Sequence, residues 1–180
     1  LILESNSQLK PYQYPGTTTV YPAEKFNYNK YMNLGARMGR APVVALCNND
    51  LIFHPNWASE ILNQLKDNPQ MASVTPYCPQ YHTKKGIPAD AEPLEAYFEL
   101  LTGWCIVVRR KVLEQIGFLD EQIIFWYSDY DYLKTLESRK FKNYLIPSAR
   151  VEHLGSETLK SISSSRQKKL TEIPHLYFDY

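Results

Sequence analysis

Continuous apolar runs alternate with amphipathic segments along this chain of 180 residues. Pro42–Cys47 (PVVALC) is apolar throughout, which is typical of a strand covered on both faces of a parallel sheet. Pro55–Lys66 has its large apolar residues on one helical stripe, with a proline at its first turn, and it predicts a helix. By the same criteria, we expect strands at Leu1–Glu4, Thr17–Tyr21, Met71–Tyr77, Trp104–Arg109, Tyr144–Ile146 and Arg150–Glu152, and helices at Phe26–Arg40, Lys111–Ile116 and Ser128–Lys140.

This alternation predicts an α/β fold with a mixed, mainly parallel sheet and helices on both faces. We expect Val43–Cys47 to be a central strand and Asn27 to cap the helix that follows it. Tyr77–Pro93 is rich in proline and predicts a loop. The polar segment after Gly155 predicts a helix or an outer wrap, and residues 1–180 predict a single domain.

Composition narrows the range of partners. Twenty basic and 19 acidic residues give a formal net charge of +1, which offers nothing to attract nucleic acid. The apolar runs at Val43–Cys47 and Cys105–Val108 are too short to span a bilayer, so no transmembrane segment is expected. Cys47 and Cys105 lie inside apolar runs, and we interpret them as buried free thiols in a reducing compartment.

Polar residues follow two of the predicted strands directly. Asn48, Asn49 and Asp50 follow the buried run that ends at Cys47, and His153 follows the last strand. Ligands of open α/β sheets gather where strands end, so these residues predict a site. An ordinary Asn/Asp turn remains the alternative for the first group.

Three segments, in order, resemble the family 2 glycosyltransferases, especially their rhamnosyltransferase-like members. Residues 26–62, which contain VVALCNND, resemble the nucleotide-sugar half of the family. Residues 102–136, which contain TGWCIVV and SDYD, resemble its acceptor half. The segment VEHLGSET at 151–158 resembles its strand-then-histidine element. The resemblance implies a GT-A fold, which is a Rossmann-like mixed sheet. It also implies inverting transfer of a hexosyl or rhamnosyl group from a UDP- or dTDP-sugar to a glycan or lipid-linked acceptor.

The same resemblance implies a role in cell-surface polysaccharide synthesis, in the cytoplasm, with membrane association through the acceptor. It also implies a first strand and a first helix before Leu1.

The metal site follows from this resemblance. Asp50 stands where the family's Asp-any-Asp motif binds Mn²⁺ or Mg²⁺, and His153 stands where the family has its metal-binding histidine. Such a cation bridges the donor phosphates and acts as a Lewis acid for the leaving diphosphate. Asn48 replaces one aspartate of the motif, so we expect modest, phosphate-dependent metal affinity.

The resemblance also identifies Asp129 as the general base that takes a proton from the acceptor hydroxyl. Ser128 stands where the family has a glutamate. A structural alternative is that Ser128 caps a helix whose first-turn acids oppose the helix dipole. Both interpretations can hold together, with Asp131 as the structural acid, paired with backbone or a basic neighbour.

Further donor contacts are implied at several positions. Glu4 stands where an aspartate helps to read the nucleobase, and Asn33 lies on a helix that faces the donor. Gly103 and Trp104 occupy a turn near the sugar, where Trp104 either stacks on a sugar ring or belongs to the core. Together with Asn48 and Asn49, these residues make up the implied donor site.

Two alternatives from other classes stay open. A nucleotidyltransferase shares the sheet and the metal but needs a glycine-rich basic phosphate loop, which this sequence lacks. A non-catalytic sugar- or nucleotide-binding domain would explain the aromatic residues and the departures at Asn48 and Ser128. Such sugar-binding modules are usually all-β, which the helical periodicities oppose.

Overall fold

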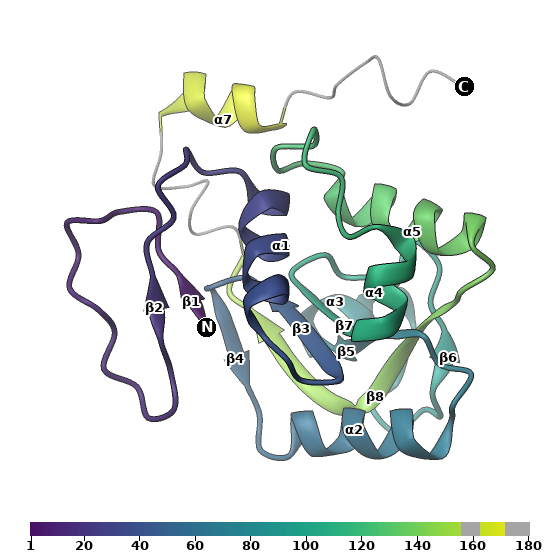
Figure 1. Cartoon of the computed structure of the whole chain (residues 1–180). Coiled ribbons are helices and arrows are strands. Elements are labelled where there is room, and N and C mark those ends of the chain that lie inside the picture. Colours follow the sequence, from purple (N-terminus) through teal and green to yellow (C-terminus); the bar gives the residue numbers. More distant parts are fainter. Residues whose placement is uncertain (156–162, 172–180) are drawn as a thin grey trace.

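A central six-stranded sheet organises the chain, as the computed structural model in Figure 1 shows for residues 1–155 and 163–171, the part that it describes. Five strands follow one another across the sheet, and a short sixth strand also pairs with β8. Their order is β3 (Val43–Cys47), β7 (Cys105–Arg109), β5 (Ser73–Tyr77), β8 (Asn143–His153) and β4 (Leu51–Phe53), and the sixth strand is β6 (Leu94–Glu95).

The direction of the strands corrects one part of the prediction. The sheet is mixed, as expected, but only β5 and β8 run parallel, and the other four pairings are antiparallel. Moreover, β3 is the end strand of the order within the described residues and not a central one. A continuous apolar run reports cover on both faces of a strand, and it carries no information about the direction of its neighbours.

Helices cover both faces of the sheet, which confirms that part of the prediction. Helices α1 (Tyr28–Met38), α4 (Arg110–Ile116) and α5 (Ser128–Ser138) pack on one face, and α2 (Trp57–Asp67) packs on the other (Figure 1). Successive residues of a strand point to opposite faces. Accordingly, Ile106 and Val108 of β7 join the core under α1, α4 and α5, while Cys105 and Val107 join the core under α2.

The ends of the helices follow local rules in part. Asn27 caps α1 as predicted, because its side-chain oxygen accepts a hydrogen bond from Lys30 N at 2.9 Å. Helix α2 begins at Trp57, two residues after the predicted proline start, following Asn56 in the left-handed region. Residues 77–93 are not wholly a loop, since they contain the helical turns α3 (Pro79–His82) and η1 (Thr83–Lys85).

Strand β8 replaces two predicted strands with one. Its pairing with β5 shifts register, so that Ile146 lies opposite Pro76 while Arg150 lies opposite the next residue, Tyr77. A shift of this kind is a bulge, which bends a strand without ending it. The last residues of β8 can therefore pair with β4, where the polar residues singled out from the sequence are found.

The remaining elements lie around this sheet. Strands β1 (Ile2–Leu3) and β2 (Thr19–Val20) form a separate parallel pair, and the Leu3 side chain packs close to Gly35 of α1. Helix α7 (Ser164–Thr171) gives part of the tail a helical form, as predicted; residues 156–162 and 172–180 lie outside the described part.

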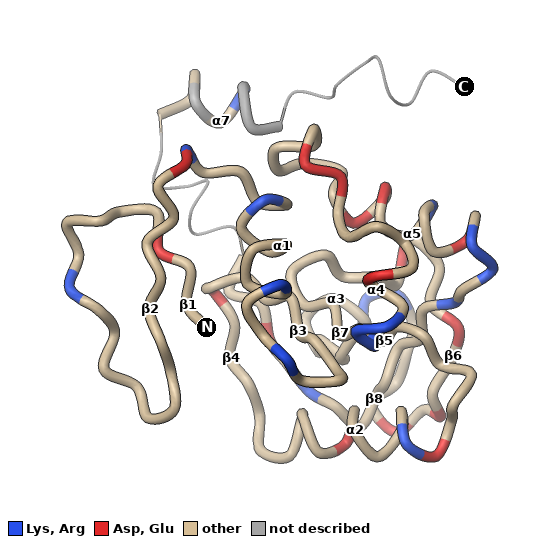
Figure 2. The backbone as a smooth tube through the Cα atoms, viewed as in Figure 1, with Lys and Arg blue, Asp and Glu red and all other residues tan. Residues whose placement is uncertain are grey.

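Acidic and basic residues occur throughout the described part of the fold. Figure 2 shows acidic and basic positions interspersed along the described chain, whose full sequence has a formal net charge of +1. Among residues 1–155 and 163–171, no helix is both long and apolar enough to cross a membrane.

Candidate active site

The antiparallel pairing of β4 and β8 brings Asp50 and His153 together. Leu51 lies opposite His153, and Leu154 N donates a hydrogen bond to Asp50 O at 3.0 Å. As a result, Asp50 Oδ2 lies 3.2 Å from His153 Nε2, and only 10% and 18% of these two side chains is exposed. From the sequence we expected these residues at the ends of separate strands, and the pairing of β4 with β8 makes them neighbours.

This pair leaves polar atoms unsatisfied. Despite the short distance, the angles do not form a hydrogen bond, and Asp50 Oδ1 and His153 Nε2 are both buried without a hydrogen-bond partner in the described part of the chain. An unpaired buried polar atom costs about 1–3 kcal/mol. A divalent cation accepts both carboxylate oxygen and imidazole nitrogen, so these two side chains fit a metal such as Mn²⁺.

The protein supplies only part of a metal shell here. Within residues 1–155 and 163–171, no group of three or more His, Cys, Asp and Glu side chains is placed to hold a metal ion. Mg²⁺-type sites commonly use one or two carboxylates and complete the shell with substrate phosphates and water. A cation held by Asp50 and His153 would therefore depend on a phosphate-bearing ligand.

Trp104 holds the imidazole in place. Its ring stacks on that of His153 with centroids 5.3 Å apart and an interplanar angle of 16°, and it packs against the core under α2. Trp104 O also accepts a hydrogen bond from Asn48 N at 2.9 Å, which ties the turn before Asp50 to the residue just before β7. Asn48 is half-buried and Asn49 is exposed in that same turn. The structure thus brings Asp50 and Trp104 against His153 and ties the backbone of Asn48 to Trp104.

Asp129 lies in the first turn of α5, directly against the Gly103 turn. A β-carbon added to Gly103 would lie 2.7 Å from Asp129 Cβ, so the carboxylate packs against bare backbone. Burial raises the pKa of Asp129, and hydrogen bonds from the backbone N–H groups of Tyr130, Asp129 and Gly103 oppose this rise. A carboxylate with a raised pKa is a better proton acceptor, which suits a general base.

The prediction that Ser128 caps α5 is wrong. The residue before the helix is Tyr127 in the left-handed region, and Ser128 is the first helical residue. Its buried hydroxyl instead hydrogen-bonds Asn29 Oδ1, which ties α5 to α1. Tertiary contact outweighs local capping here because Asn29 is itself buried and fixed by the Asp120 carbonyl.

Asp131 also differs from its expected role. The charge that raises its pKa, after burial, is that of the acidic Asp120 and not of a basic neighbour. Among the described residues, the Asp131 side chain has neither the ion pair nor the backbone partner expected from the sequence, and the charge of Asp120 acts on its carboxyl instead. Asp131 is half-buried on α5, two residues after Asp129, which contacts the Gly103 turn.

Tyr28 is a site residue that sequence reasoning missed. Its phenol donates a hydrogen bond to Gly103 O at 3.0 Å and fixes the turn on which Asp129 rests. Burial raises the pKa of Tyr28, and the nearby Cys47, Asp129 and Asp50 raise it further, so the phenol stays protonated. In the sequence Tyr28 lies on the apolar stripe of α1, where it is indistinguishable from a core residue.

Asn33 does not lie free to meet a donor. Its amide nitrogen donates to Leu119 O at 2.9 Å and to Glu121 Oε1 at 3.0 Å, and its oxygen accepts from Leu119 N at 3.0 Å. The side chain is buried, and these three bonds tether α1 to the segment before α5. These bonds give Asn33 a role in the packing of α1, and its contact with a donor stays a prediction.

Glu4 closes a local turn after β1. One carboxylate oxygen accepts from Asn6 N at 2.7 Å, and the other accepts from the Tyr12 hydroxyl at 3.0 Å. These contacts are exposed and local, and β1 itself lies beside α1. The structure thus places Glu4 next to the helix that carries Tyr28, without bringing it into contact with Asp50 or His153.

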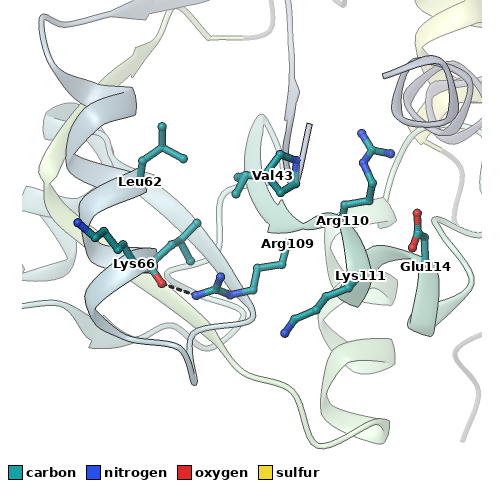
Figure 3. A pocket seen from close by; sticks show the side chains of 9 residues that line it. Val43, Leu62, Lys66, Arg109, Arg110, Lys111 and Glu114 are labelled. Atoms are coloured by element: carbon teal, nitrogen blue, oxygen red, sulfur yellow. Dashed lines mark hydrogen bonds between the residues drawn. The ribbon is translucent and has the colours of Figure 1, made fainter. Parts of the chain in front are cut away.

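A cavity of about 480 Å³ lies at the opposite end of β3 and is distinct from this site (Figure 3). Arg109 and Arg110 in its wall donate to backbone carbonyls at the ends of α2 and α1, including Leu65 O and Ala36 O. Helix C-termini favour such cationic partners, so these arginines have a structural explanation. The cavity is lined by Pro42, Val43, Leu62, Leu65, Lys66, Arg109, Arg110, Lys111 and Glu114 and contains no predicted site residue.

Comparison with known proteins gives the fold. No known family profile matches the chain, and no curated protein sequence matches it. Among solved structures, it resembles GalNAc-T7 with UDP, GalNAc and Mn²⁺ (TM-score 0.59, 12% identity, 75% of this chain and 32% of the other). It also resembles the mannosyltransferase PcManGT of Pyrobaculum calidifontis with GDP-Man and Mn²⁺ (0.59, 16%, 78% and 40%).

A third similar structure is the catalytic domain of Drosophila β1,4-galactosyltransferase 7 with xylobiose (TM-score 0.54, 15% identity, 86% of this chain and 64% of the other). The chain thus spans between about a third and two thirds of the length of these solved chains. Identities this low establish the fold and not the activity. The protein has the GT-A glycosyltransferase fold, as the sequence resemblance led us to expect.

Proposed function

We propose that this chain is the catalytic domain of an inverting, metal-assisted glycosyltransferase that uses a nucleoside-diphosphate sugar. The observation that carries the proposal is the buried, unsatisfied pair Asp50 and His153 on a GT-A fold. The similar structures contain Mn²⁺ with UDP or with GDP-Man, which supports a cation and a nucleotide at such a site. Residues 1–180 form the proposed single domain.

Each residue has a distinct task in this proposal. Asp50 and His153 would hold a divalent cation, Mn²⁺ or Mg²⁺, which when bound supplies positive charge to the leaving diphosphate. Trp104 keeps the imidazole oriented through its stacked ring. Asp129, held against Gly103, would take the proton of the acceptor hydroxyl as that oxygen attacks the anomeric carbon.

The proposal also specifies the donor and the acceptor, which the fold alone does not. We propose a UDP- or dTDP-linked hexose or rhamnose as donor, with Glu4 assigned to the nucleobase and Asn48, Asn49 and the Gly103 turn to the phosphates and sugar. The acceptor is a glycan or a lipid-linked glycan, and the setting is cytoplasmic synthesis of cell-surface polysaccharide, with the membrane reached through the acceptor. Xylobiose in one similar structure supports a glycan acceptor.

A donor-hydrolysis assay tests this function. Purified chain is incubated with UDP-, dTDP- or GDP-sugars and Mn²⁺ or Mg²⁺, and free nucleoside diphosphate is measured. We expect slow release of the nucleoside diphosphate, which a chelator and the Asp50→Asn substitution should each abolish. Added Mn²⁺ should restore the release in the chelator-treated unsubstituted chain and not in Asp50→Asn. With an acceptor present, NMR of the product linkage should show inversion at the anomeric carbon.

Other outcomes identify the alternatives. Nucleotide binding without turnover would replace the proposal with a sugar- or nucleotide-binding domain, an alternative that the departures at Asn48 and Ser128 favour. Release of pyrophosphate instead of a nucleoside diphosphate would indicate a nucleotidyltransferase. If the chain neither turns over any donor nor binds a nucleotide, the assignment of Asp50 and His153 to a metal and nucleotide site is wrong.

A further inference from the structure

Two cysteines face each other at the end of β3 nearest the candidate site. Cys47 and Cys105 are direct cross-strand partners of the antiparallel β3–β7 pair, and their sulfur atoms lie 3.6 Å apart. Both side chains belong to the core under α2, and Cys47 is half-buried while Cys105 is fully buried. The two thiols therefore lie side by side on the face of the sheet that α2 covers.

Their position in the ladder suits a covalent bond. Asn48 N donates to Trp104 O immediately beyond the two cysteines, so Cys47 and Cys105 occupy a non-hydrogen-bonded pair. The Cα atoms of such pairs are about 4.5 Å apart, which lies within the roughly 4.4–6.8 Å that a disulfide bridges. A bond of about 2.05 Å requires the sulfurs to approach by about 1.5 Å, a distance that side-chain rotation supplies.

We propose that Cys47 and Cys105 form an oxidative modification site, at which a peroxide converts the two thiols into a reversible disulfide. The Cys47 thiolate attacks one peroxide oxygen, which gives a sulfenic acid and, after protonation of the leaving hydroxide, water. The Cys105 sulfur then attacks Cys47 Sγ and the S–O bond breaks. The departing hydroxide takes the proton of the Cys105 thiol and leaves as a second water. In total, two thiols and one hydrogen peroxide give one disulfide and two waters.

The order of reaction follows from exposure. Only Cys47 is open to solvent in part, so it meets the oxidant first, and the buried Cys105 is the resolving thiol. The product would join the segment that carries Asp50 to the segment that carries Trp104, the residue stacked on His153. This consequence for the site rests on the proposed function, but formation of the disulfide does not.

Mass spectrometry of the unsubstituted protein tests the proposal without reference to activity. Fully reduced chain is treated with a small excess of hydrogen peroxide, and the product is digested without reductant. We expect an intact-mass loss of about 2 Da, the mass of two hydrogens, with a linked peptide pair containing Cys47 and Cys105, and we expect a thiol reductant to reverse both. The thermal midpoint should rise by roughly 5–10 °C on oxidation.

Substitutions supply matched controls. Cys47→Ala and Cys105→Ala should each abolish the mass loss, while Cys78→Ser should keep it, because Cys78 is buried elsewhere with its thiol on Gln80 Oε1. A gel without reductant separates this product from cross-linked dimers. Oxygen added to Cys47 without a link, a link that includes Cys78, or an unchanged mass would each overturn the proposal.

Discussion

Gly103 and Asp129 are in contact through bare backbone, since a β-carbon on Gly103 would lie 2.7 Å from Asp129 Cβ and 2.8 Å from its Oδ2. The backbone of Gly103 is not in the left-handed region, so close approach, and not turn geometry, requires glycine here. The Tyr28 phenol holds the same turn by a hydrogen bond to Gly103 O. The position of the proposed base is thus set by residues from three separate elements.

Gly103→Ala should therefore displace Asp129 and impair transfer. A misplacement of about 1 Å in a catalytic group costs about 10²-fold in rate, so we expect a loss of that size in kcat with donor binding little changed. Gly35→Ala is the matched control, because its added methyl would meet only the flexible Leu3 side chain, at 3.3 Å. Equal activity of the Gly103 and Gly35 variants would show that Asp129 is not the group that reacts.

Metal binding should depend on Asp50 and His153 together and on a phosphate ligand. Changes even outside a metal's direct ligands cost about 10–100-fold in affinity, so Asp50→Asn or His153→Ala should weaken Mn²⁺ binding at least that much. Calorimetric titration of Mn²⁺ with and without UDP measures this, and we expect much tighter binding with UDP.

His54→Ala provides the control for this titration. His54 lies just beyond β4 and pairs with Glu152 of β8 at 2.6 Å, so it is a second histidine–carboxylate pair on the same two segments. Neither residue belongs to the proposed metal shell, so His54→Ala should keep Mn²⁺ affinity. Loss of affinity in His54→Ala with retention in Asp50→Asn would move the metal to the other pair.

Asn33→Ala should act on stability and not on donor binding. The substitution leaves the backbone N–H and C=O of Leu119 without their partner, and Leu119 is buried. We expect a loss of about 1–3 kcal/mol in the free energy of unfolding, measured by urea titration. Asn49→Ala, at an exposed position, should leave stability unchanged. Weakened UDP affinity in Asn33→Ala at unchanged stability would restore the donor role predicted from the sequence.

The sequence predicted the elements better than their pairing. Apolar runs and helical stripes identified Pro42–Cys47 and Pro55–Lys66 because period and burial are local properties of a segment. The antiparallel neighbours of β3 were not predictable in this way, since direction depends on how distant strands meet. Likewise, the Ser128 contact to Asn29 overrode a local capping signal through a tertiary hydrogen bond.

The candidate site shows the same division. Residue type and position after a strand pointed to Asp50 and His153, and the β4–β8 register places them 3.2 Å apart. Tyr28 stayed hidden because its function depends on one hydrogen bond to Gly103, which no spacing in the sequence encodes. The tertiary hydrogen bonds of Asn33 were not predictable either, because they cannot be read from the helix that carries it.

Asp129→Asn keeps the shape of the proposed base but removes its capacity to accept a proton. Loss of a general base costs about 10²–10⁴-fold in rate, so kcat should fall by that factor while UDP affinity is retained. Since Asp129 must be ionised to act, kcat/KM of the unsubstituted chain should rise with pH through a pKa above the ordinary 3.8, because burial raises the pKa of this carboxyl. The Asp129→Asn variant should lack that rise.

Stability gives an independent measurement of the same carboxyl. Because its folded-state pKa is raised, Asp129 contributes stability that is present below the unfolded-state pKa and is lost as the pH rises through the folded-state pKa. Asp129→Asn does not ionise, so it should be more stable than the unsubstituted chain at neutral pH, and the difference should vanish below about pH 3.8, the ordinary aspartate value. Asp131→Asn, whose carboxyl pKa is also raised by burial, should show the same gain in stability with transfer intact. If Asp131→Asn abolishes transfer while Asp129→Asn keeps it, Asp131 is the base; if both keep it, the chain transfers sugar without either carboxylate.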